Sequence, residues 1–359
     1  MRKKGRRSAA IRMTLTDPAL LAEEKILVVQ HSTAVDFLGI AYPTLRLHES
    51  SANILLAHAL ARAPTEFVLT ECQFINTTEV QLPPSSSPPL PASNFWLTVW
   101  SEHAKSAPVL DMALSCIESS TGKYPLFMWT RPAVDMRSSQ WLNTRVGRVT
   151  AHLHGCVPLE RVFAVFGPTA LVTSFAKAWA ELTHFKINPE PLYKAFLASC
   201  ASQELTTSVP AAHCGARKAT MKDVEAAGKL CQQFANGSAY PLSLADATAE
   251  AQQLINKGQL WVGIFNGVIA SICAVTRSSL HVSTITKVFT APEARRNGVA
   301  QTLVGEVTRR LFDSGKHSVV LYVACDNSAQ RVYERVGFRM QTTDVWLELG
   351  FVGTHPGHW

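Results

Sequence analysis

From about residue 215 onward, hydrophobic and polar positions follow clear periods. Alternating or continuous apolar runs predict strands at 216–219, 260–265, 268–275, 282–290, 319–324 and 340–349. Apolar residues at helical spacing predict helices at 224–234, 244–255, 299–312 and 328–336. This part of the chain therefore has the predicted order β-α-α-β-β-β-α-β-α-β.

Local signals mark the ends of several of these elements. Thr220 and Asp223 are typical of a helix start, since a hydroxyl caps the first amides and an acid suits the first turn. Asn266-Gly267 is the dipeptide that a tight hairpin turn favours. Gly337 closes the last predicted helix.

The earlier part of the chain gives a less regular pattern. Asp17-Pro18 predicts a helix start, with the helix running through 19–29. We also expect helices and strands to alternate here, with helices at 53–63 and 169–182 and strands at 124–129 and 161–166. This pattern indicates a second α/β unit.

Two segments interrupt the chain. The Pro- and Ser-rich stretch 82–92 favours neither a helix nor a central strand, and we interpret it as a loop inside the first domain. At about 201–215, Ser, Thr, Pro, His and Gly replace the apolar periods, which predicts a domain boundary. We therefore expect a tail at 1–12, an N-terminal α/β domain at 13–205 and a C-terminal domain at 215–352; a length of 359 residues suits two domains.

Composition narrows the class of protein. Apolar residues make up 47% of the chain and charged residues 17%, which is too apolar for a disordered protein. No run approaches the roughly 20 apolar residues of a membrane-spanning helix. We therefore expect a globular protein that is not a membrane protein.

The net charge of +7 is unevenly spread. Residues 1–12 carry six basic side chains and no acid, 13–214 carry 13 basic against 16 acidic, and 215–359 carry 15 against 11. Because no basic stripe interleaved with aromatic residues appears, we expect no nucleic-acid partner. The basic tail is either a weak targeting peptide or a disordered terminus, and translation starts at Met1 or at Met13.

The cysteines and histidines give no metal-binding pattern. No two of the eight cysteines have zinc-site spacing, and without a secretory signal they indicate reduced, mostly buried thiols in the cytoplasm. His152 and His154 would face one side of a strand, but no acid or cysteine lies at ligand spacing, so a structural role is favoured. We expect no metal.

The segment Val288-Phe-Thr-Ala-Pro-Glu-Ala-Arg-Arg-Asn-Gly-Val-Ala300 carries the main chemical signal. It reads as a strand, a short turn and a helix start. The first amides of a helix have no partners within the helix and carry partial positive charge, so they bind anions. Gly298 lets a phosphate approach the backbone, and Arg295 and Arg296 add charge. The alternative is an ordinary helix cap on a basic surface.

A second motif, Ala329-Gln-Arg-Val-Tyr-Glu-Arg-Val-Gly-Phe338, follows a buried apolar strand. With both motifs in this order, the sequence resembles the GNAT (general N-acetyltransferase) superfamily of acyltransferases over about residues 215–350. The resemblance implies a GNAT acyl-CoA N-acyltransferase fold in the C-terminal domain. Within the superfamily, a degenerate copy sometimes precedes the active domain, but 13–214 holds no second Arg-x-x-Gly-x-Ala turn, so this is an analogy.

The resemblance also implies a mechanism and a set of residues. The pantetheine arm of acetyl-CoA would lie between strands 282–290 and 319–324, and Tyr333 would act as general acid toward the leaving thiolate. The amine acceptor, a small molecule or a peptide, would attack the thioester directly. The residues implied in cofactor binding are Val288, Phe289, Thr290, Arg295, Arg296, Asn297, Gly298, Val299, Ala300 and Asn327.

Two departures from the family leave roles open. Asn327 lies six residues before Tyr333 and Asp326 seven, whereas the family has asparagine at seven, so Asn327 either contacts the cofactor or caps the helix. The splayed strand carries Lys287 as its only charged residue, so no general base is assigned; Glu293 reads as a surface residue and Cys325 as a packing thiol.

Three functions remain open at this point. The leading one is acetyl transfer to an amine, with the first domain forming the acceptor pocket or covering the cleft. The missing strand carboxylate favours a second, an acyl-CoA-binding sensor or scaffold without acceptor chemistry. The third keeps the chemistry with a longer acyl-CoA. The pattern indicates neither the acceptor nor the oligomeric state.

Overall fold

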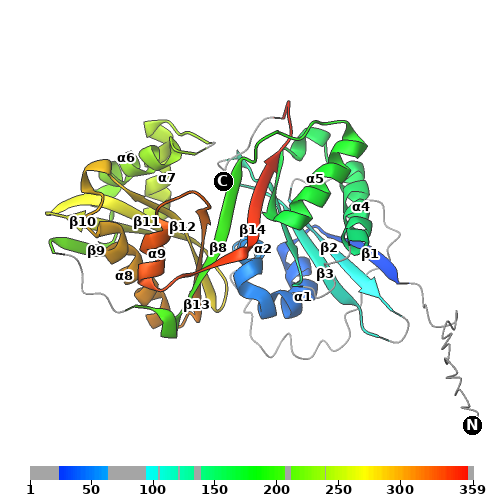
Figure 1. The fold of residues 1–359 in the computed structure, drawn as a ribbon, viewed down its shortest axis with the longest axis horizontal. Helices are drawn as coiled ribbons and strands as arrows, with labels where there is room; N and C mark the ends of the chain where they lie inside the picture. The colour runs from blue at the N-terminus through cyan, green and yellow to red at the C-terminus, as the bar shows by residue number, and fades with distance from the viewer. Residues whose placement is uncertain are drawn as a thin grey trace, which may run out of the picture.

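The computed structural model describes residues 24–63, 94–103, 106–119, 122–132, 139–206, 212–238 and 240–354. Within these residues, twelve strands form one continuous sheet in the order β1-β2-β3-β6-β7-β14-β8-β13-β12-β11-β10-β9. Figure 1 shows this sheet crossing the whole molecule, with helices packed along it. The protein has the predicted mixed α/β fold.

The first half of the chain contributes the elements up to β8. They are β1 (Lys25–His31), α1 (Ala34–Leu45), α2 (Glu49–Leu60), β2 (Phe95–Glu102), β3 (Val109–Cys116), β6 (Leu126–Thr130), α4 (Ser139–Cys156), β7 (Ala164–Pro168), α5 (Thr169–Thr183) and β8 (Tyr193–Ala201). A two-stranded hairpin, β4 (Glu118–Ser119) and β5 (Gly122–Lys123), lies outside the large sheet.

The second half contributes the remaining elements. They are β9 (Cys214–Lys218), α6 (Val224–Ala235), α7 (Leu244–Asn256), β10 (Leu260–Phe265), β11 (Val268–Ser278), β12 (Val282–Thr290), α8 (Val299–Asp313), β13 (Ser318–Ala324), α9 (Gln330–Val336) and β14 (Arg339–Gly350). Their order is the predicted β-α-α-β-β-β-α-β-α-β, and each element lies within a few residues of its predicted bounds.

The two halves repeat one topology and exchange their last strands. Apart from the small hairpin, the first half also runs β-α-α-β-β-β-α-β-α-β. Its last strand, β8, pairs with β13 of the second half, while β14 pairs with β7 of the first half and also with β8. The sheet order therefore reads as a palindrome about the β14–β8 pair. Topology thus supports a repeated unit that the sequence motifs did not reveal.

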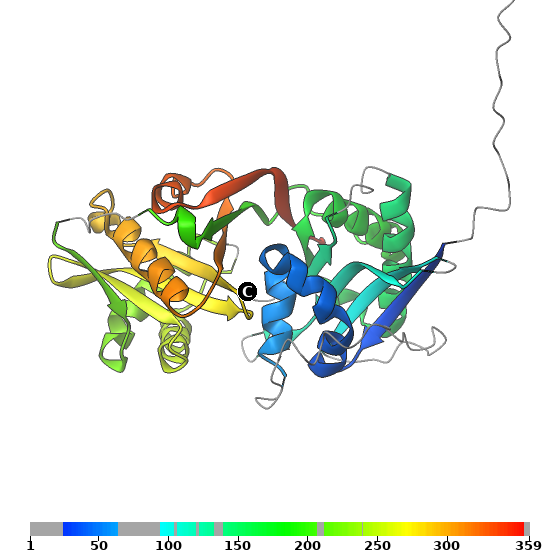
Figure 2. The ribbon, with the colours of Figure 1, turned by 90° about the horizontal axis from the view of Figure 1, so that it is seen from below.

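Helices cover both faces of the sheet. Figure 2 shows α1, α2, α6 and α7 below the sheet and α4, α5, α8 and α9 above it. Leu254, Val262 and Ile272 belong to the core beneath α6 and α7, whereas Leu303, Val304 and Leu321 belong to the core beneath α8. Each face therefore has its own apolar core.

Helix α2 of the first half packs against strands of the second. The Asn53 side chain accepts a hydrogen bond from the Thr284 hydroxyl at 3.0 Å and donates to the Tyr322 hydroxyl at 3.2 Å. A Glu49 carboxylate oxygen accepts the backbone amide of His281 at 3.1 Å. The first half therefore contributes side chains to the face of β12 and β13 that α8 does not cover.

Two expectations about the first half are wrong. Residues 25–29 are strand, not helix, because Leu27 and Val29 alternate into the core. His152 and His154 lie on helix α4, not on a strand, and two residues along a helix turn through about 200°. His152 contacts Gln30 at 2.9 Å, while His154 lies edge-on to Trp179.

Other expectations stay predictions. The tail 1–12 and the segment 82–92 lie outside the described residues. The division into 13–205 and 215–352 also stays a prediction, although the exchanged strands join the two parts in one sheet. In the described ranges, no helix is long and apolar enough to cross a membrane, and no group of three or more His, Cys, Asp or Glu is placed to hold a metal.

Candidate functional site

Strands β12 and β13 run parallel and then part. They pair from Val282–Ser318 to Ile285–Leu321, and beyond this point each continues without the other, β12 to Thr290 and β13 to Ala324. Both strands keep their outer neighbours, β11 and β8. The sheet therefore opens between their carboxyl ends, where the sequence predicts a splayed pair.

A β-bulge coincides with the point of parting. Lys287 pairs with Ala274 and Ile285 with Val275, so Thr286 is the extra residue on β12. The Thr276 hydroxyl donates to that of Thr286 at 3.0 Å and holds the bulge. Since a bulge bends its strand and increases its twist, it turns the end of β12 away from β13.

Beyond the bulge, alternate backbone groups of β12 face the opening. The Ala291 amide donates to the Ala270 carbonyl at 2.8 Å, so Ala291 and Ala270 form a hydrogen-bonded pair. Hydrogen-bonded and non-hydrogen-bonded pairs alternate along an antiparallel ladder, so Val288 and Thr290 belong to non-hydrogen-bonded pairs. Their amides and carbonyls therefore point away from β11. They face the gap left by β13, as the resemblance implies for strand residues that bind a pantetheine arm.

The turn after β12 leads into the start of α8. Arg296 has a φ of 64° and Gly298 a φ of 78°, and Gly298 is the residue before the first helical turn. The Gly298 carbonyl accepts the Thr302 amide, whereas the amides of Val299 and Ala300 precede the first bond of the helix. Left-handed residues beside a helix start gather amides on one side, an arrangement that binds anions.

Basic side chains line this turn. Arg295, Arg296 and Asn297 are exposed. The Arg295 guanidinium donates to the Thr290 carbonyl at 3.1 Å and lies 5.5 Å from the Phe289 ring centre, so it sits at the mouth of the opening. The predicted residues 288–300 are therefore brought together at one end of the gap.

Tyr333 lies on α9, on the α8 side of the sheet. Its side chain is 8% exposed and meets the Phe338 ring edge-on at 6.0 Å. Burial raises the pKa of the Tyr333 phenol well above its ordinary value, and Cys273 and Tyr193 add to the rise. The phenol therefore stays protonated at neutral pH and can donate a proton.

Asn327 and Cys325 lie in the turn between β13 and α9. The Asn327 side-chain oxygen accepts the Ala329 amide at 2.9 Å, within the turn that leads into α9. The two roles that the sequence leaves open for Asn327 stay predictions. Burial raises the pKa of the Cys325 thiol, which does not favour a thiolate nucleophile.

The sequence missed several polar residues around the gap. Both carboxylate oxygens of Glu250, on α7, lie 2.7 Å from the Lys287 ammonium. Tyr193 begins β8, and Glu348 is its register partner on β14. No local signal could identify these residues, because strand pairing and the packing of α7 bring them together from distant parts of the chain.

The corresponding strand pair of the first half is shorter. Strands β6 and β7 pair in parallel at Leu126–Val165 and Phe127–Phe166. One position further they are still close, since a Cβ on Gly167 would lie 2.8 Å from the Met128 carbonyl oxygen. Helix α5 also starts directly after β7, whereas a turn separates β13 from α9. The two strand pairs therefore differ at the ends where β12 and β13 part.

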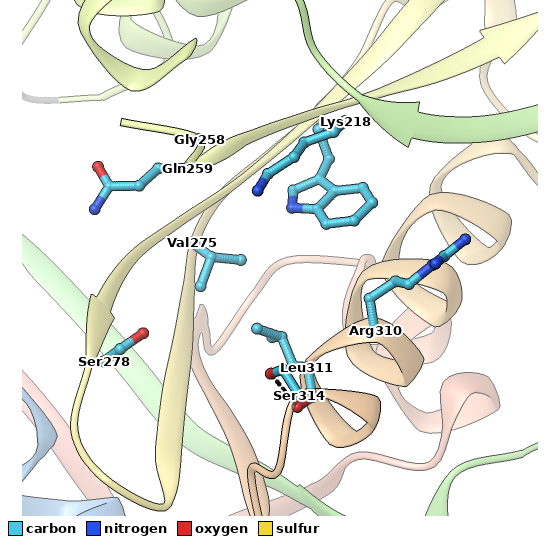
Figure 3. Close-up of a pocket in the computed structure, with 9 residues that line it drawn as sticks. Lys218, Gly258, Gln259, Val275, Ser278, Arg310, Leu311 and Ser314 are labelled. Carbon is cyan, nitrogen blue, oxygen red and sulfur yellow. Dashed lines mark hydrogen bonds between the residues drawn. The ribbon is translucent and has the colours of Figure 1, made fainter. Parts of the chain in front are cut away.

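A pocket lies at the other end of α8. Figure 3 shows Lys218, Arg310 and Ser314 around it, between the last turn of α8 and strands β9 to β11. It contains none of the predicted site residues. Helix α8 spans 15 residues, or about 22 Å at 1.5 Å per residue, so this pocket is remote from Gly298.

A family model matches part of the second half. Residues 261–347 match the model of the FR47-like protein family, and this range includes β12, α8, β13 and α9. No curated protein matches the chain in sequence. The family model thus falls on the part of the chain that holds the open strand pair.

Solved structures of low sequence identity resemble the fold. A Drosophila protein of known X-ray structure is 11% identical, with a TM-score of 0.50 over 78% of this chain and 86% of its own. A GCN5-related N-acetyltransferase from Sphaerobacter thermophilus is 14% identical, with a TM-score of 0.48 over 92% and 97%. A tandem GNAT protein from the clavulanic acid biosynthesis pathway is 12% identical, with a TM-score of 0.42 over 93% and 100%.

Proposed function

Because the C-terminal region of this chain holds a domain of the GNAT superfamily, we propose that the protein is an acyl-CoA-dependent N-acyltransferase that moves an acetyl group from acetyl-CoA to an amine. One observation carries the proposal. Strands β12 and β13 part at Ile285, directly beside a helix start whose amides and arginines suit a diphosphate.

In this proposal, the opening holds the two ends of acetyl-CoA differently. The diphosphate lies on the amides of 296–300, with Arg295 and Arg296 at its edge. The pantetheine arm pairs with the backbone of Val288 and Thr290 in place of a strand. The thioester then lies near the bulge, deep between β12 and β13.

The residues suit direct attack by an amine. The amine nitrogen forms a bond to the thioester carbonyl carbon, and the carbon–sulfur bond breaks. Tyr333 donates its phenolic proton to the leaving thiolate and recovers a proton from the nitrogen through solvent. From a neutral amine the products are an amide and coenzyme A, and from an ammonium ion one proton is released in addition. No acyl-enzyme is formed.

Replacing Tyr333 by phenylalanine tests the general acid. We expect kcat for CoA release with a panel of primary amines to fall about 10²-fold or more, the usual contribution of a positioned proton donor. The affinity for acetyl-CoA stays unchanged, because the ring still packs on Phe338. Tyr42→Phe, at a buried tyrosine on α1, is the control and keeps full activity. An undiminished kcat in Tyr333→Phe contradicts the assignment.

The difference between the two halves predicts the stoichiometry of cofactor binding. Since β6 and β7 lie close together at Gly167 and Met128, and 13–214 holds no second Arg-x-x-Gly-x-Ala turn, we expect acetyl-CoA to bind in the second half alone. Titration calorimetry with acetyl-CoA is expected to give one site per chain. Two equivalent sites would contradict this account of the first half.

A second candidate is an acyl-CoA sensor that lacks acceptor chemistry. The observation that favours it lies on β12, where the only charged side chain, Lys287, is paired with Glu250 and no carboxylate faces the gap from that strand. A protein that binds acetyl-CoA but releases no CoA with any amine would support the sensor. A series of longer acyl-CoAs tests the remaining alternative, a different donor.

A further inference from the structure

A carboxylate is buried where the two halves meet. Glu348 lies on β14 and is 1% exposed. One of its carboxylate oxygens accepts the hydroxyl of Tyr240 at 2.7 Å, and Tyr240 comes from the segment between α6 and α7. Burying a carboxylate is costly unless polar groups compensate, and the Tyr240 hydroxyl is one such group.

Strand register places Glu348 on the face away from α8. Its neighbours Leu347 and Leu349 pack into the core beneath α4 and α5, so the side chain of Glu348 points to the opposite face. Its register partners on both sides are aromatic, Tyr193 on β8 and Phe166 on β7. Glu348 therefore lies among aromatic rings on the face covered by α2, α6 and α7.

Tyr193 links Glu348 to the opening. The Tyr193 hydroxyl donates to the Tyr322 carbonyl of β13 at 3.3 Å. Burial raises the pKa of Tyr193; the charge of Arg277 opposes this rise, and Cys325 and Glu348 add to it. Strand register sets Tyr193 beside Glu348, and its hydroxyl reaches β13, so Tyr193 lies between Glu348 and the end of β13.

Other charged groups lie on the same face. Arg277, on β11, is buried with its guanidinium 5.7 Å from the Tyr322 ring centre. Lys287 on β12 is held by Glu250 on α7, and Glu49 on α2 binds the His281 amide. Among these, Glu348 is the carboxylate beside Tyr193 and the end of β13.

We propose that Glu348 binds the ammonium group of the acceptor amine and removes its proton, and that the Tyr240 hydroxyl occupies the ammonium position in the free protein. This proposal rests on the proposed function. The acceptor would enter from the α2 and α6–α7 face, while the thiolate leaves toward Tyr333 on the α9 face. A cationic amine with an apolar or aromatic body suits the surrounding rings.

The proton balance of the step is complete. The acceptor enters as an ammonium ion, and one N–H bond breaks as its proton moves to a Glu348 oxygen. The neutral amine then attacks the thioester as described above. Glu348 returns its proton to solvent after the amide leaves, which accounts for the single proton released per turnover.

Glu348→Gln tests the base. Glutamine keeps the shape and accepts the Tyr240 hydroxyl, but it cannot take a proton. We expect kcat/KM for primary amines to fall about 10²-fold, the lower end for general-base catalysis, with acetyl-CoA affinity unchanged. Raising the pH restores the rate, because free amine becomes available; a merely structural role would not give this recovery. Glu334→Gln, at an exposed glutamate on α9, is the matched control.

Binding of the acceptor is tested without turnover. With coenzyme A in place of acetyl-CoA, so that no transfer occurs, benzylamine is expected to bind wild type but not Glu348→Gln, and benzyl alcohol, its uncharged analogue, to bind neither. Tyr240→Phe is expected to lower the KM for the amine severalfold, because the competing hydroxyl is gone. If wild type binds both acetyl-CoA and benzylamine but releases no CoA, the transferase fails and the amine site stands. Equal benzylamine binding by wild type and Glu348→Gln, or unchanged kcat/KM, overturns the role of Glu348.

Discussion

Replacing Gly298 by valine is expected to abolish the binding of acetyl-CoA. Gly298 has a φ of 78°, a conformation that a β-branched residue adopts only with strain of about 1–3 kcal/mol. Its Cβ branches would also occupy the place proposed for a phosphate oxygen at the start of α8. We expect the Kd measured by calorimetry to rise at least 100-fold.

The other end of the same helix offers a matched control. Gly315, just after α8, has a φ of 92°, and a Cβ there would meet nothing within 4 Å. Gly315→Val therefore carries a similar backbone cost at a place without the proposed phosphates. Both variants should unfold at lower temperature, but only Gly298→Val should lose the cofactor. An unchanged Kd in Gly298→Val would sink the diphosphate site.

The second half of the fold could be predicted because its signals are local. Asn266-Gly267 turns the hairpin of β10 and β11, and Gly337 ends α9 with a φ of 116°. The same holds for the turn before α8, since Gly298 and the strand before it are neighbours in sequence. Such features need no knowledge of distant contacts.

The first half resisted prediction for a physical reason. Every residue of β2 from Phe95 to Ser101 is buried, so the alternation that identifies a strand with one exposed face is missing. The sequence favours a helix where β1 lies, because the apolar run is short and follows Asp17-Pro18, which is typical of a helix start. Periodicity alone does not separate a short buried strand from a helix.

The exchange of β8 and β14 also lies beyond local patterns. Neither strand has an unusual sequence, and each pairs with strands more than 100 residues away along the chain. The polar cluster of Tyr193, Tyr240 and Glu348 forms because of this pairing. The turn proposed to bind the cofactor could thus be predicted from the sequence, whereas the acceptor end proposed here could not.

Ending the chain after Phe338 is expected to unfold both halves. This truncation removes β14, which pairs with β7 over five residue pairs and with β8 over seven. It also removes Trp346 and Phe351, which are 4% and 2% exposed and belong to the cores beneath α2 and beneath α5.

The free energy of unfolding that this truncation removes can be compared with the usual stability of a protein. Emptying a buried Phe or Trp site costs about 3–5 kcal/mol each, and whole proteins are stable by only about 5–15 kcal/mol. Two open strand edges add to this cost, so the truncated chain should show no cooperative thermal transition. Ending the chain after Thr354 removes none of these contacts and should leave Tm unchanged. If the chain ending at Phe338 still melted cooperatively near the Tm of the full chain, β14 could not be the strand that joins the two halves.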